Sequence, residues 1–491
     1  MPRLSLFYRA TLAVLLCTAS ATAAAEPARD PAAVTMLERS IAAHAAGPAR
    51  VRLSYRGTTT SPDQGTAADG PARPHPWAID LALDEAAQSF SMSSDIGIDG
   101  GFRFPRKVGF SGGKGFATRY TGEYDPLTEM PAEANGQLPH LLLRTILKNA
   151  QALRVASDPL FDRLEYGLAN GTTASLQFER STHLLVAQRR ARTPSAFGDR
   201  LLEIIYGPYR RVGTTMVPQS MALRFEAPAL GAFDYSLDLI GAAVGGPTNA
   251  ELIPPPGARK RIAPSAEFAV ERFGDNLFLL RNAATEGQFS YNVLVIAFSD
   301  HVMVVEAALN DATSRRVIDT VAELAPSKPI RTLVQTHHHG DHIGGIRTYV
   351  ATGTHILAPI GTRGFIERIA ASHSAVAPDT LAKAPRAVSL EEVAGDRSIA
   401  DATNEVRLFD WPNDHSGRML IVYLPRQKLL YQGDLVSAGE LPINPTTSAF
   451  VDWVRDRKLV VEVIAGLHGR TLRGVEVNDL LHRGRLQASA R

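Results

Sequence analysis

The sequence has almost no cysteine, since Cys17 is the only one among 491 residues. Because Cys17 falls inside the leader described below, the exported chain would contain none, which excludes a disulfide-stapled fold and a cysteine nucleophile. The sequence also lacks an excess of either sign of charge. Its formal net charge is only +2, so the composition indicates no nucleic-acid partner. No apolar run reaches the ~18 residues of a membrane-spanning helix. The hydrophobic content of 45% is instead typical of globular domains.

The first 25 residues have the pattern of a secretory signal peptide. Arg3 and Arg9 precede a short apolar stretch, and a run of small residues then ends at Ala25. A basic start, an apolar centre and a small-residue cleavage site are typical of export signals that are removed. We therefore predict a bacterial protein, periplasmic or secreted, with no transmembrane anchor after cleavage. An uncleaved anchor and lipid attachment at Cys17 are alternatives, which the short apolar run and the bulky Leu16 disfavour.

Residues 26–253 are predicted to form a mainly antiparallel β domain. Apolar residues alternate with small or polar ones, as in Leu81–Leu83 and Met221–Phe225, and glycine-rich turns separate such stretches. A period of two is typical of half-buried strands. Short helices are expected over residues 30–46 and 138–153.

Three consecutive prolines mark the clearest domain boundary. Because proline cannot donate to a sheet ladder, residues 254–264 are predicted to be a linker. After the linker, buried strands at residues 293–296 and 302–305 precede a helix over residues 312–325, and strands and helices alternate to the end. Residues 265–491 are therefore predicted to be a second, α/β domain, and the whole chain belongs to the α+β class.

The segment Thr336–Gly345 carries the densest group of metal-binding side chains. Imidazole and carboxylate are the ligands that Zn²⁺ prefers in catalytic sites. His337 and His339 lie two residues apart, so an extended backbone sends both rings to one side. Asp341 and His342 follow where the chain bends, so this one loop offers donors for two metal positions. The alternative is a chance surface cluster, which repulsion among protonated rings disfavours.

The same segment resembles the H-x-H-x-D-H signature of the metallo-β-lactamase superfamily. Later motifs follow in the order that this superfamily uses: Asp414–Gly417, Gly433-Asp434 and Gly466–Gly469. The resemblance covers about residues 265–480 and implies an αββα sandwich that holds two metal ions. It assigns His337, His339 and His415 to the first metal, Asp341, His342 and His468 to the second, and Asp434 to a position between them.

The resemblance also implies a reaction. Such sites hydrolyse substrates with a hydroxide held between two Zn²⁺ ions, and Asp341 would be the catalytic residue that orients the hydroxide and carries a proton. Iron or manganese would suit the same donors. Asp434 is typical of glyoxalase II-like and lactonase-like branches rather than of β-lactamases. The expected substrate is therefore a small or amphiphilic molecule with an ester, lactone or related bond.

Two positions depart from the family pattern or lie outside it. Glu306 follows a predicted strand where many relatives have an aspartate that supports the metal loop, so it is expected either to replace that aspartate or to be a surface carboxylate. His338 lies between two assigned ligands, and its position in an extended segment turns it away from the metal. We expect it to be a bystander; the alternatives are a residue that supports the metal ligands and a residue on the substrate side.

The β domain itself offers a weaker resemblance. Residues 205–218 and the alternating strand after them are similar to periplasmic lipoprotein-carrier-like domains, which implies a curved sheet able to hold an acyl chain; a generic β domain is the alternative. Two further functions therefore remain open: a mononuclear iron redox enzyme of the same superfamily, and a non-catalytic ligand or lipid carrier. The oligomeric state stays open as well.

Overall fold

A computed structural model describes residues 29–483 of the chain, with gaps at 71–72, 98–102, 120–121, 132–133, 169–170, 193–196, 262–267, 282–288, 373–375 and 440–442. The signal peptide predicted over residues 1–25 lies outside the described residues. Within them, every helix is too short or too polar to cross a membrane.

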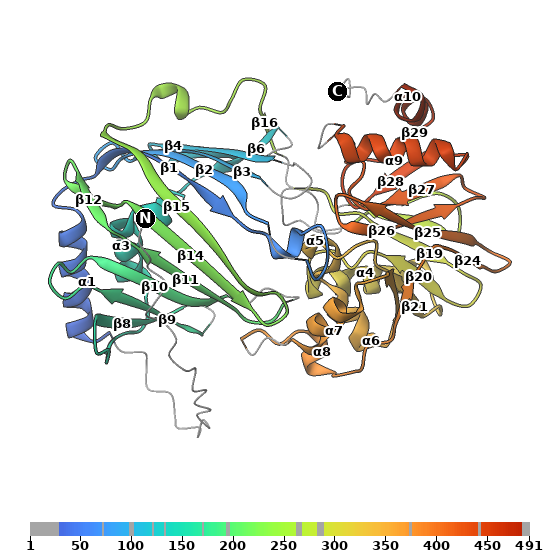
Figure 1. Ribbon diagram of the computed structural model, residues 1–491, viewed down its shortest axis with the longest axis horizontal. Helices are drawn as coiled ribbons and strands as arrows, with labels where there is room; N and C mark the ends of the chain where they lie inside the picture. The colour runs from blue at the N-terminus through green and yellow to red at the C-terminus, as the bar shows by residue number, and fades with distance from the viewer. Residues whose placement is uncertain are drawn as a thin grey trace.

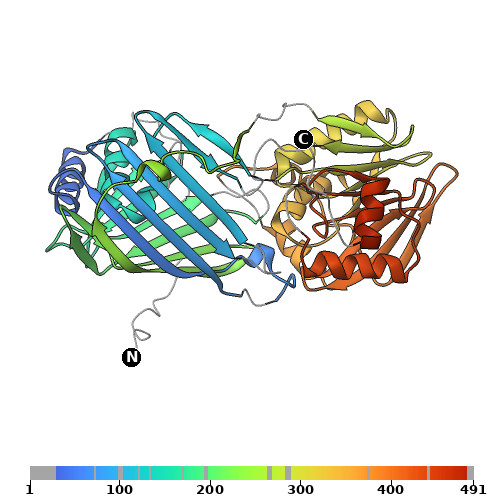
Figure 2. The ribbon, with the colours of Figure 1, turned by 90° about the horizontal axis from the view of Figure 1, so that it is seen from above.

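The N-terminal part is one curved sheet of fourteen strands wrapped around a hydrophobic core (Figures 1 and 2). The strands run in the order β16-β6-β5-β4-β3-β2-β1-β15-β14-β11-β10-β9-β8-β7, and all neighbours except β16 and β6 are antiparallel. Their bounds are β1 Arg50–Thr59, β2 His75–Asp84, β3 Ser89–Gly97, β4 Arg103–Ser111, β5 Lys114–Thr118, β6 Glu123–Leu127, β7 Leu153–Ala156, β8 Asp162–Gly167, β9 Thr173–Phe178, β10 Leu185–Arg192, β11 Arg200–Tyr206, β14 Ser220–Ala227, β15 Gly231–Val244 and β16 Arg259–Lys260.

A small hairpin and three helices complete this domain: β12 Tyr209–Val212, β13 Thr215–Pro218, α1 Pro31–His44, α2 Ala134–Gln137 and α3 Pro139–Asn149. α1 begins where expected, because Asp30 caps its first turn and Pro31 occupies its first position. The helices α1 and α3 pack on each other and bury Leu37 and Leu143 in the core of the sheet. The predicted linker contributes to this sheet as well, since β16 pairs in parallel with β6.

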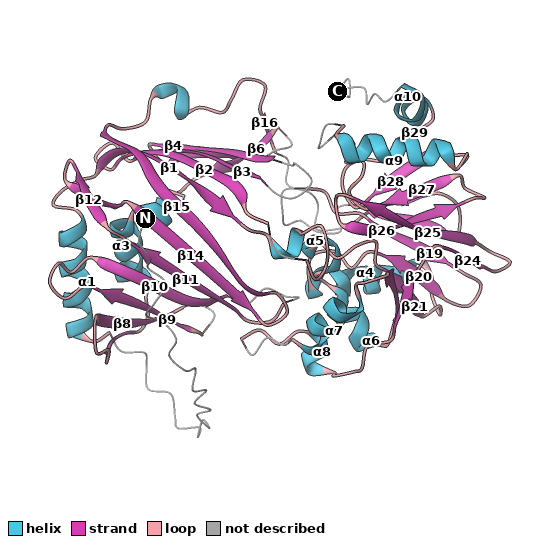
Figure 3. Cartoon of the chain, in the orientation of Figure 1, coloured by secondary structure: helices cyan, strands magenta, loops and turns pink. Residues whose placement is uncertain are grey.

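The C-terminal part contains two sheets face to face with helices on both outer faces (Figure 3). The first sheet, in spatial order, has β17 Ala269–Arg272, β18 Leu277–Arg281, β19 Val293–Ala297, β20 Val302–Val305, β21 Ile330–Val334, β22 His355–Pro359 and β23 Leu390–Val393. The second has β24 Asp396–Ala400, β25 Glu405–Asn413, β26 Gly417–Leu424, β27 Leu429–Gln432, β28 Val463–Gly466 and β29 Leu472–Arg473.

Its helices are α4 Asp311–Leu324, α5 Gly340–Ile343, α6 Ile346–Thr352, α7 Arg363–Ala371, α8 Thr380–Lys383, α9 Pro445–Asp456 and α10 Val475–Arg483. Side chains from α4, α6 and α7 share a core with the first sheet, α9 and α10 share one with the second, and a third core lies between the sheets. This is the αββα sandwich that the sequence predicts, and the predicted α+β class is confirmed.

The strand directions decide where chemistry can be placed. β20, β21, β22 and β23 are parallel, so their carboxyl ends meet at one edge of the first sheet. All four residues of β20 are buried, as expected of a strand covered on both faces. Glu306 follows the end of β20, and the histidine segment follows the end of β21. The two segments are therefore held side by side by the sheet.

Candidate metal centre

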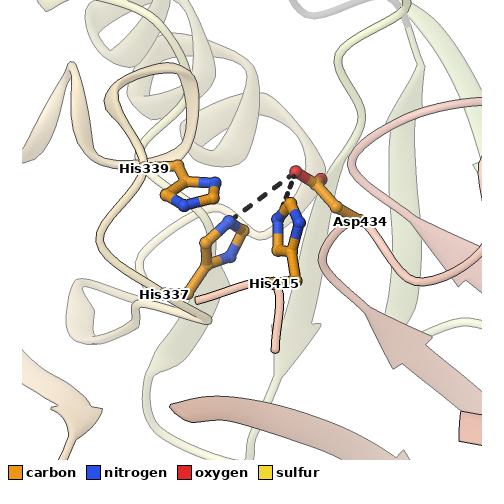
Figure 4. A group of neighbouring side chains, drawn as sticks. All are labelled: His337, His339, His415 and Asp434. Atoms are coloured by element: carbon orange, nitrogen blue, oxygen red, sulfur yellow. Dashed lines mark hydrogen bonds and ion pairs between the residues drawn. The ribbon is translucent and has the colours of Figure 1, made fainter. Parts of the chain in front are cut away.

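The seven residues assigned as metal ligands from the sequence lie together at this edge of the sandwich. They form two groups, and within each group the donor atoms lie within 4.8 Å of one another. Figure 4 shows the first group, in which the imidazole rings of three histidines lie on one side of the carboxylate of Asp434. The groups consist of His337, His339, His415 and Asp434, and of Asp341, His342 and His468.

Five separate segments of the C-terminal domain deliver these side chains. His337 and His339 follow β21, Asp341 and His342 belong to the single turn of α5, and the other three donors follow β25, β27 and β28. Gly433, before Asp434, is required by close packing: a Cβ at this position would lie 3.0 Å from Nδ1 of His337. The backbone of the second sheet can therefore approach the histidine segment only without a side chain there.

Asp434 lies between the two groups. Its Oδ2 is 3.1 Å from Nε2 of His415 and 3.7 Å from Nε2 of His337. Its Oδ1 is 2.7 Å from Nε2 of His342 and 3.3 Å from Nε2 of His468. Each carboxylate oxygen thus faces the histidines of one group, which is the arrangement that a bridging carboxylate requires.

Hydrogen bonds to Glu306 determine which nitrogen of two rings carries the proton. Nδ1 of His342 lies 3.1 Å from Oε1 of Glu306, and a carboxylate accepts, so this nitrogen carries the hydrogen. The Thr336 hydroxyl donates its hydrogen to the same Glu306 oxygen at 2.5 Å. The hydroxyl oxygen of Thr336 therefore accepts from Nδ1 of His337 at 3.1 Å. In both rings the neutral form therefore leaves Nε2 unprotonated and turned toward the centre.

The rings of His468 and His339 are fixed in the same way by main-chain carbonyls. Nδ1 of His468 lies 2.9 Å from the oxygen of Ser290, and its Nε2 is 3.0 Å from Oδ2 of Asp341. Nε2 of His339 lies 3.0 Å from the oxygen of Gly65, which leaves its Nδ1 as the unprotonated nitrogen. A carbonyl only accepts, so each ring must donate to it.

The donor set fits divalent metal ions. Nε2 of His337 and Nδ1 of His339 are buried and have no hydrogen-bond partner, although buried polar atoms are normally satisfied. Each is the nitrogen that its ring's other hydrogen bond leaves unprotonated. Neutral imidazole nitrogens and carboxylate oxygens facing one another are the donors of catalytic zinc sites, and iron and manganese accept the same set.

The electrostatics of the centre favour positive charge. Burial raises the pKa of Asp341, but the neighbouring His342 and His468 outweigh burial and hold it well below the usual value. Burial lowers the pKa of His468, but Asp434 and Asp341 outweigh burial and raise it to about 9. In His337 burial and the adjacent rings together lower the pKa well below 6.5. The carboxylates thus stay ionised, and protons and metal ions compete for the same nitrogens.

Glu306 and His338 can now be placed. Glu306 is fully buried with a left-handed φ of 84°, and it supports His342 directly and His337 through Thr336, so it takes the place of the expected aspartate rather than lying on the surface. His338 is not a bystander. It is buried, and its Nε2 lies 2.8 Å from the same Gly65 oxygen that His339 contacts.

Sequence reasoning missed the contribution of the β domain to this centre. The loop between β1 and β2 supplies Gly65 to His338 and His339, and Nε2 of Gln64 donates to Oδ1 of Asp341 at 3.0 Å. These residues lie more than 270 positions from their partners. No local pattern in the sequence signals such a contact.

One segment of the chain has the spacing of a serine-hydrolase motif, but its geometry does not suit a nucleophile. Gly109–Gly113 has the G-x-S-x-G spacing of a nucleophile elbow, which requires a sharp turn from a strand into a helix. Here Ser111 is the exposed last residue of strand β4, and the hairpin turn after it leads into strand β5 rather than into a helix. The buried donor set at the sandwich edge therefore defines the class of protein: an αββα protein with a candidate centre for more than one metal ion.

Comparison with known families agrees with this class. Residues 287–468 match the family model described as the metallo-beta-lactamase superfamily, and this range includes all seven donors. This match over residues 287–468 confirms the resemblance seen in the sequence motifs.

Individual relatives are distant. The alkyl/aryl-sulfatase BDS1 of Saccharomyces cerevisiae is 26% identical over 105 residues, which are 20% of this chain and 15% of that protein. The chain therefore matches only about 15% of the length of this curated relative. Solved structures similar to this chain include a metallo-beta-lactamase from Pontibacter korlensis, with 14% identity over 44% of this chain and 97% of that one and a TM-score of 0.35. Another is FIM-1 from Pseudomonas aeruginosa in its mono-zinc form, with 19% identity over 45% of this chain and 96% of that one and a TM-score of 0.35.

Proposed function

We propose that this protein is an exported hydrolase that holds two metal ions and cleaves an ester, lactone or related bond. One observation carries the proposal: five imidazole rings and two carboxylates from separate segments converge in a buried site, where two of the rings, His337 and His339, turn unpartnered nitrogens toward a common space. In a purely structural role, hydrogen-bond donors would satisfy these nitrogens. A catalytic metal centre instead requires nitrogens that carry no hydrogen and have no hydrogen-bond partner until a metal ion binds.

Divalent ions held by these groups would supply a hydroxide near neutral pH and polarise the bond to be cleaved. The chain's own contribution is orientation and proton handling. His468 and Gln64 fix the two carboxylate oxygens of Asp341 from opposite domains, at 3.0 Å each. Because its pKa is held low, Asp341 is an ionised acceptor at the centre, suited to orient a nucleophile and to pass its proton to the leaving group.

Zinc is the ion that we propose first, because the donors are imidazole nitrogen and carboxylate oxygen only. Iron or manganese would serve the same hydrolytic role if they were more available to the protein.

The substrate class is proposed from two sources. Asp434 faces both groups, a feature that we associate with the ester- and lactone-cleaving branches. The yeast relative is named an alkyl/aryl-sulfatase, so sulfate esters belong in the same panel of candidates. An amphiphilic substrate is consistent with the β domain, whose partly buried aromatic residues Trp77 and Tyr235 line its core near the end of β1.

The test is metal analysis followed by a hydrolysis screen of the purified chain. We expect two metal ions per chain and cleavage of at least one ester, lactone, phosphodiester or sulfate ester. The substitution His339→Ala should remove that activity while leaving the circular dichroism spectrum unchanged. His482→Ala, at an exposed histidine far along the chain, is the matched control and should retain the parent's rate.

Two outcomes would overturn the proposal. A single iron per chain together with redox activity would support the mononuclear redox enzyme instead. Equal hydrolysis by His339→Ala and the parent would show that these donors are not the catalytic centre, leaving the ligand carrier as the better account.

A further inference from the structure

The loop between β1 and β2 leaves the β domain and ends on the metal centre. It includes the short 3₁₀ turn Pro62–Gln64, and in Figures 1 and 2 this turn lies beside α5 of the C-terminal domain. We refer to residues 60–70 as the β1–β2 loop. Gly65 in this loop is buried even though it belongs to a connection between strands, which normally runs over the surface.

The C-terminal domain is shaped to receive this loop. Gly417 has a φ of 70°, and a Cβ there would lie 2.5 Å from the main-chain oxygen of Thr66. A Cβ on Gly340, at the start of α5, would lie 2.8 Å from Oδ2 of Asp63. Farther along the loop, Asp69 forms an ion pair with Arg368 of α7. Two glycines therefore stand where the loop comes closest to the segments that carry His415 and Asp341.

The Gly65 carbonyl is aimed at a metal-binding ring. It accepts from Nε2 of His339 at 3.0 Å and from Nε2 of His338 at 2.8 Å, which uses both of its lone pairs. The first bond places the hydrogen of neutral His339 on Nε2 and so leaves Nδ1 for the metal. Within the sandwich, Glu306 and Ser290 do the same for other rings, whereas His339 depends on the other domain.

Gln64 acts on the second group of donors. Its amide donates to Oδ1 of Asp341 at 3.0 Å, while Oδ2 of the same carboxylate faces His468 at 3.0 Å. A carboxylate that is held at one oxygen by a hydrogen bond presents the other oxygen in a fixed direction. Gln64 therefore controls which way Asp341 points its donor atom.

We infer that the β domain completes the metal centre, with Gly65 and Gln64 as positioning residues for His339 and Asp341. This inference rests on the proposed function only in requiring that the centre binds metal. It predicts that metal affinity, and not just the contact between the domains, depends on a loop that lies outside the superfamily domain. Partners of this kind commonly change metal affinity by about 10- to 100-fold.

The experiment compares metal binding by the full chain and three variants. Gln64→Met removes the amide donor at similar bulk, and Gln151→Met is the matched control at an exposed glutamine of the β domain. A third variant lacks residues 61–70, which leaves a short connection between β1 and β2. Zinc affinity is measured by competition with a chromogenic chelator, and the cobalt-substituted proteins are compared by visible absorption.

We expect Gln64→Met to lower the affinity for the second metal ion by about 10-fold or more. The cobalt spectrum should change, and the thermal unfolding of the metal-free chain should not. The loop deletion should lower the affinity for both metal ions, because it also removes the Gly65 carbonyl. Gln151→Met should match the parent. Since a merely structural contact would not alter the cobalt spectrum, this readout separates positioning from packing.

The inference is overturned if Gln64→Met binds both ions as the parent does and gives the parent's cobalt spectrum. The proposed function would stand in that case, because the parent still binds metal. If the parent itself binds no metal, the proposed function fails first. The two failures are therefore distinguishable from the same titrations.

Discussion

The two domains of this protein bury histidine in opposite electrostatic surroundings. In the β domain, His44 ends α1, donates to the Ser40 carbonyl at 2.8 Å and accepts from the amide of Leu185 at 3.3 Å. Burial is the main reason that its pKa falls to about 4. In the metal centre, His468 is equally buried, yet two carboxylates raise its pKa to about 9.

This difference shows what each region is built to hold. His44 has both nitrogens satisfied by main-chain groups, so it is a neutral core residue that completes a helix end. The histidines of the metal centre have one nitrogen satisfied and the other turned toward shared carboxylates. A core histidine is complete without a cation, whereas the centre is complete only with one. The following experiments test that contrast, beginning with the largest expected effect.

Replacing Asp434 should affect only the C-terminal domain, and severely. Asp434→Asn removes the charge that faces both donor groups, so we expect loss of tight binding of both ions and a fall in hydrolysis of more than about 100-fold. Metal content and steady-state rates measure this. Asp452→Asn, at an exposed aspartate of α9, is the control. If Asp434→Asn kept its activity and two bound ions, the charge of Asp434 would not be needed to hold metal, and the contrast with the neutral surroundings of His44 would fail.

Zinc should stabilise the centre and leave α1 unchanged. At a zinc concentration about 1,000 times the dissociation constant, binding raises the free energy of opening by ~4 kcal/mol. Hydrogen–deuterium exchange should therefore slow in residues 335–343 and 463–469 on adding zinc to chelator-treated protein. Peptides from α1 provide the internal reference. Slowing in the β1–β2 loop would extend the effect across the domains, whereas equal exchange everywhere would contradict metal binding at this site.

Acid should destabilise the β domain through His44. Its pKa is 6.5 in the unfolded chain and about 4 in the folded one, so between these values the unfolded state binds a proton that the folded state does not. Stability therefore falls as the pH drops from about 6.5 to 4, by about 3 kcal/mol in total. Urea unfolding of the parent and of His44→Gln, which does not titrate, measures the difference. Parallel pH profiles for the two proteins would show that His44 does not control acid stability.

Glu306 should have the smallest of these effects, because it acts through His342 and Thr336 rather than on the metal. Glu306→Gln keeps the size of the side chain but replaces an accepting oxygen with a donor, so we expect zinc to bind about 10-fold more weakly. Chelator competition measures the change, and the exposed Glu367→Gln is the control. An unchanged affinity would mean that the rings hold their orientation without this carboxylate.

Local sequence patterns predicted several of the elements. The helix expected over residues 30–46 is α1, and the helix expected over residues 312–325 is α4 with Asn310 as its cap. The strand expected before the histidine segment is β21. The linker was harder to interpret. Three prolines signal a break in local structure, but they do not show that β16, two residues beyond Gly257, joins the sheet of the β domain. Edge pairing of a two-residue strand depends on what lies beside it rather than on its own composition.

By itself, the sequence determined the donor chemistry: seven side chains in superfamily order, a buried strand leading into them, and an α+β chain in two parts. Only the tertiary structure decided how those donors are held. It made Glu306 a buried support, gave His338 a role, and brought Gly65 and Gln64 onto His339 and Asp341. The physical reason is that periodicity reports which face of one element is buried, whereas a hydrogen bond across more than 270 residues exists only after two domains have packed together.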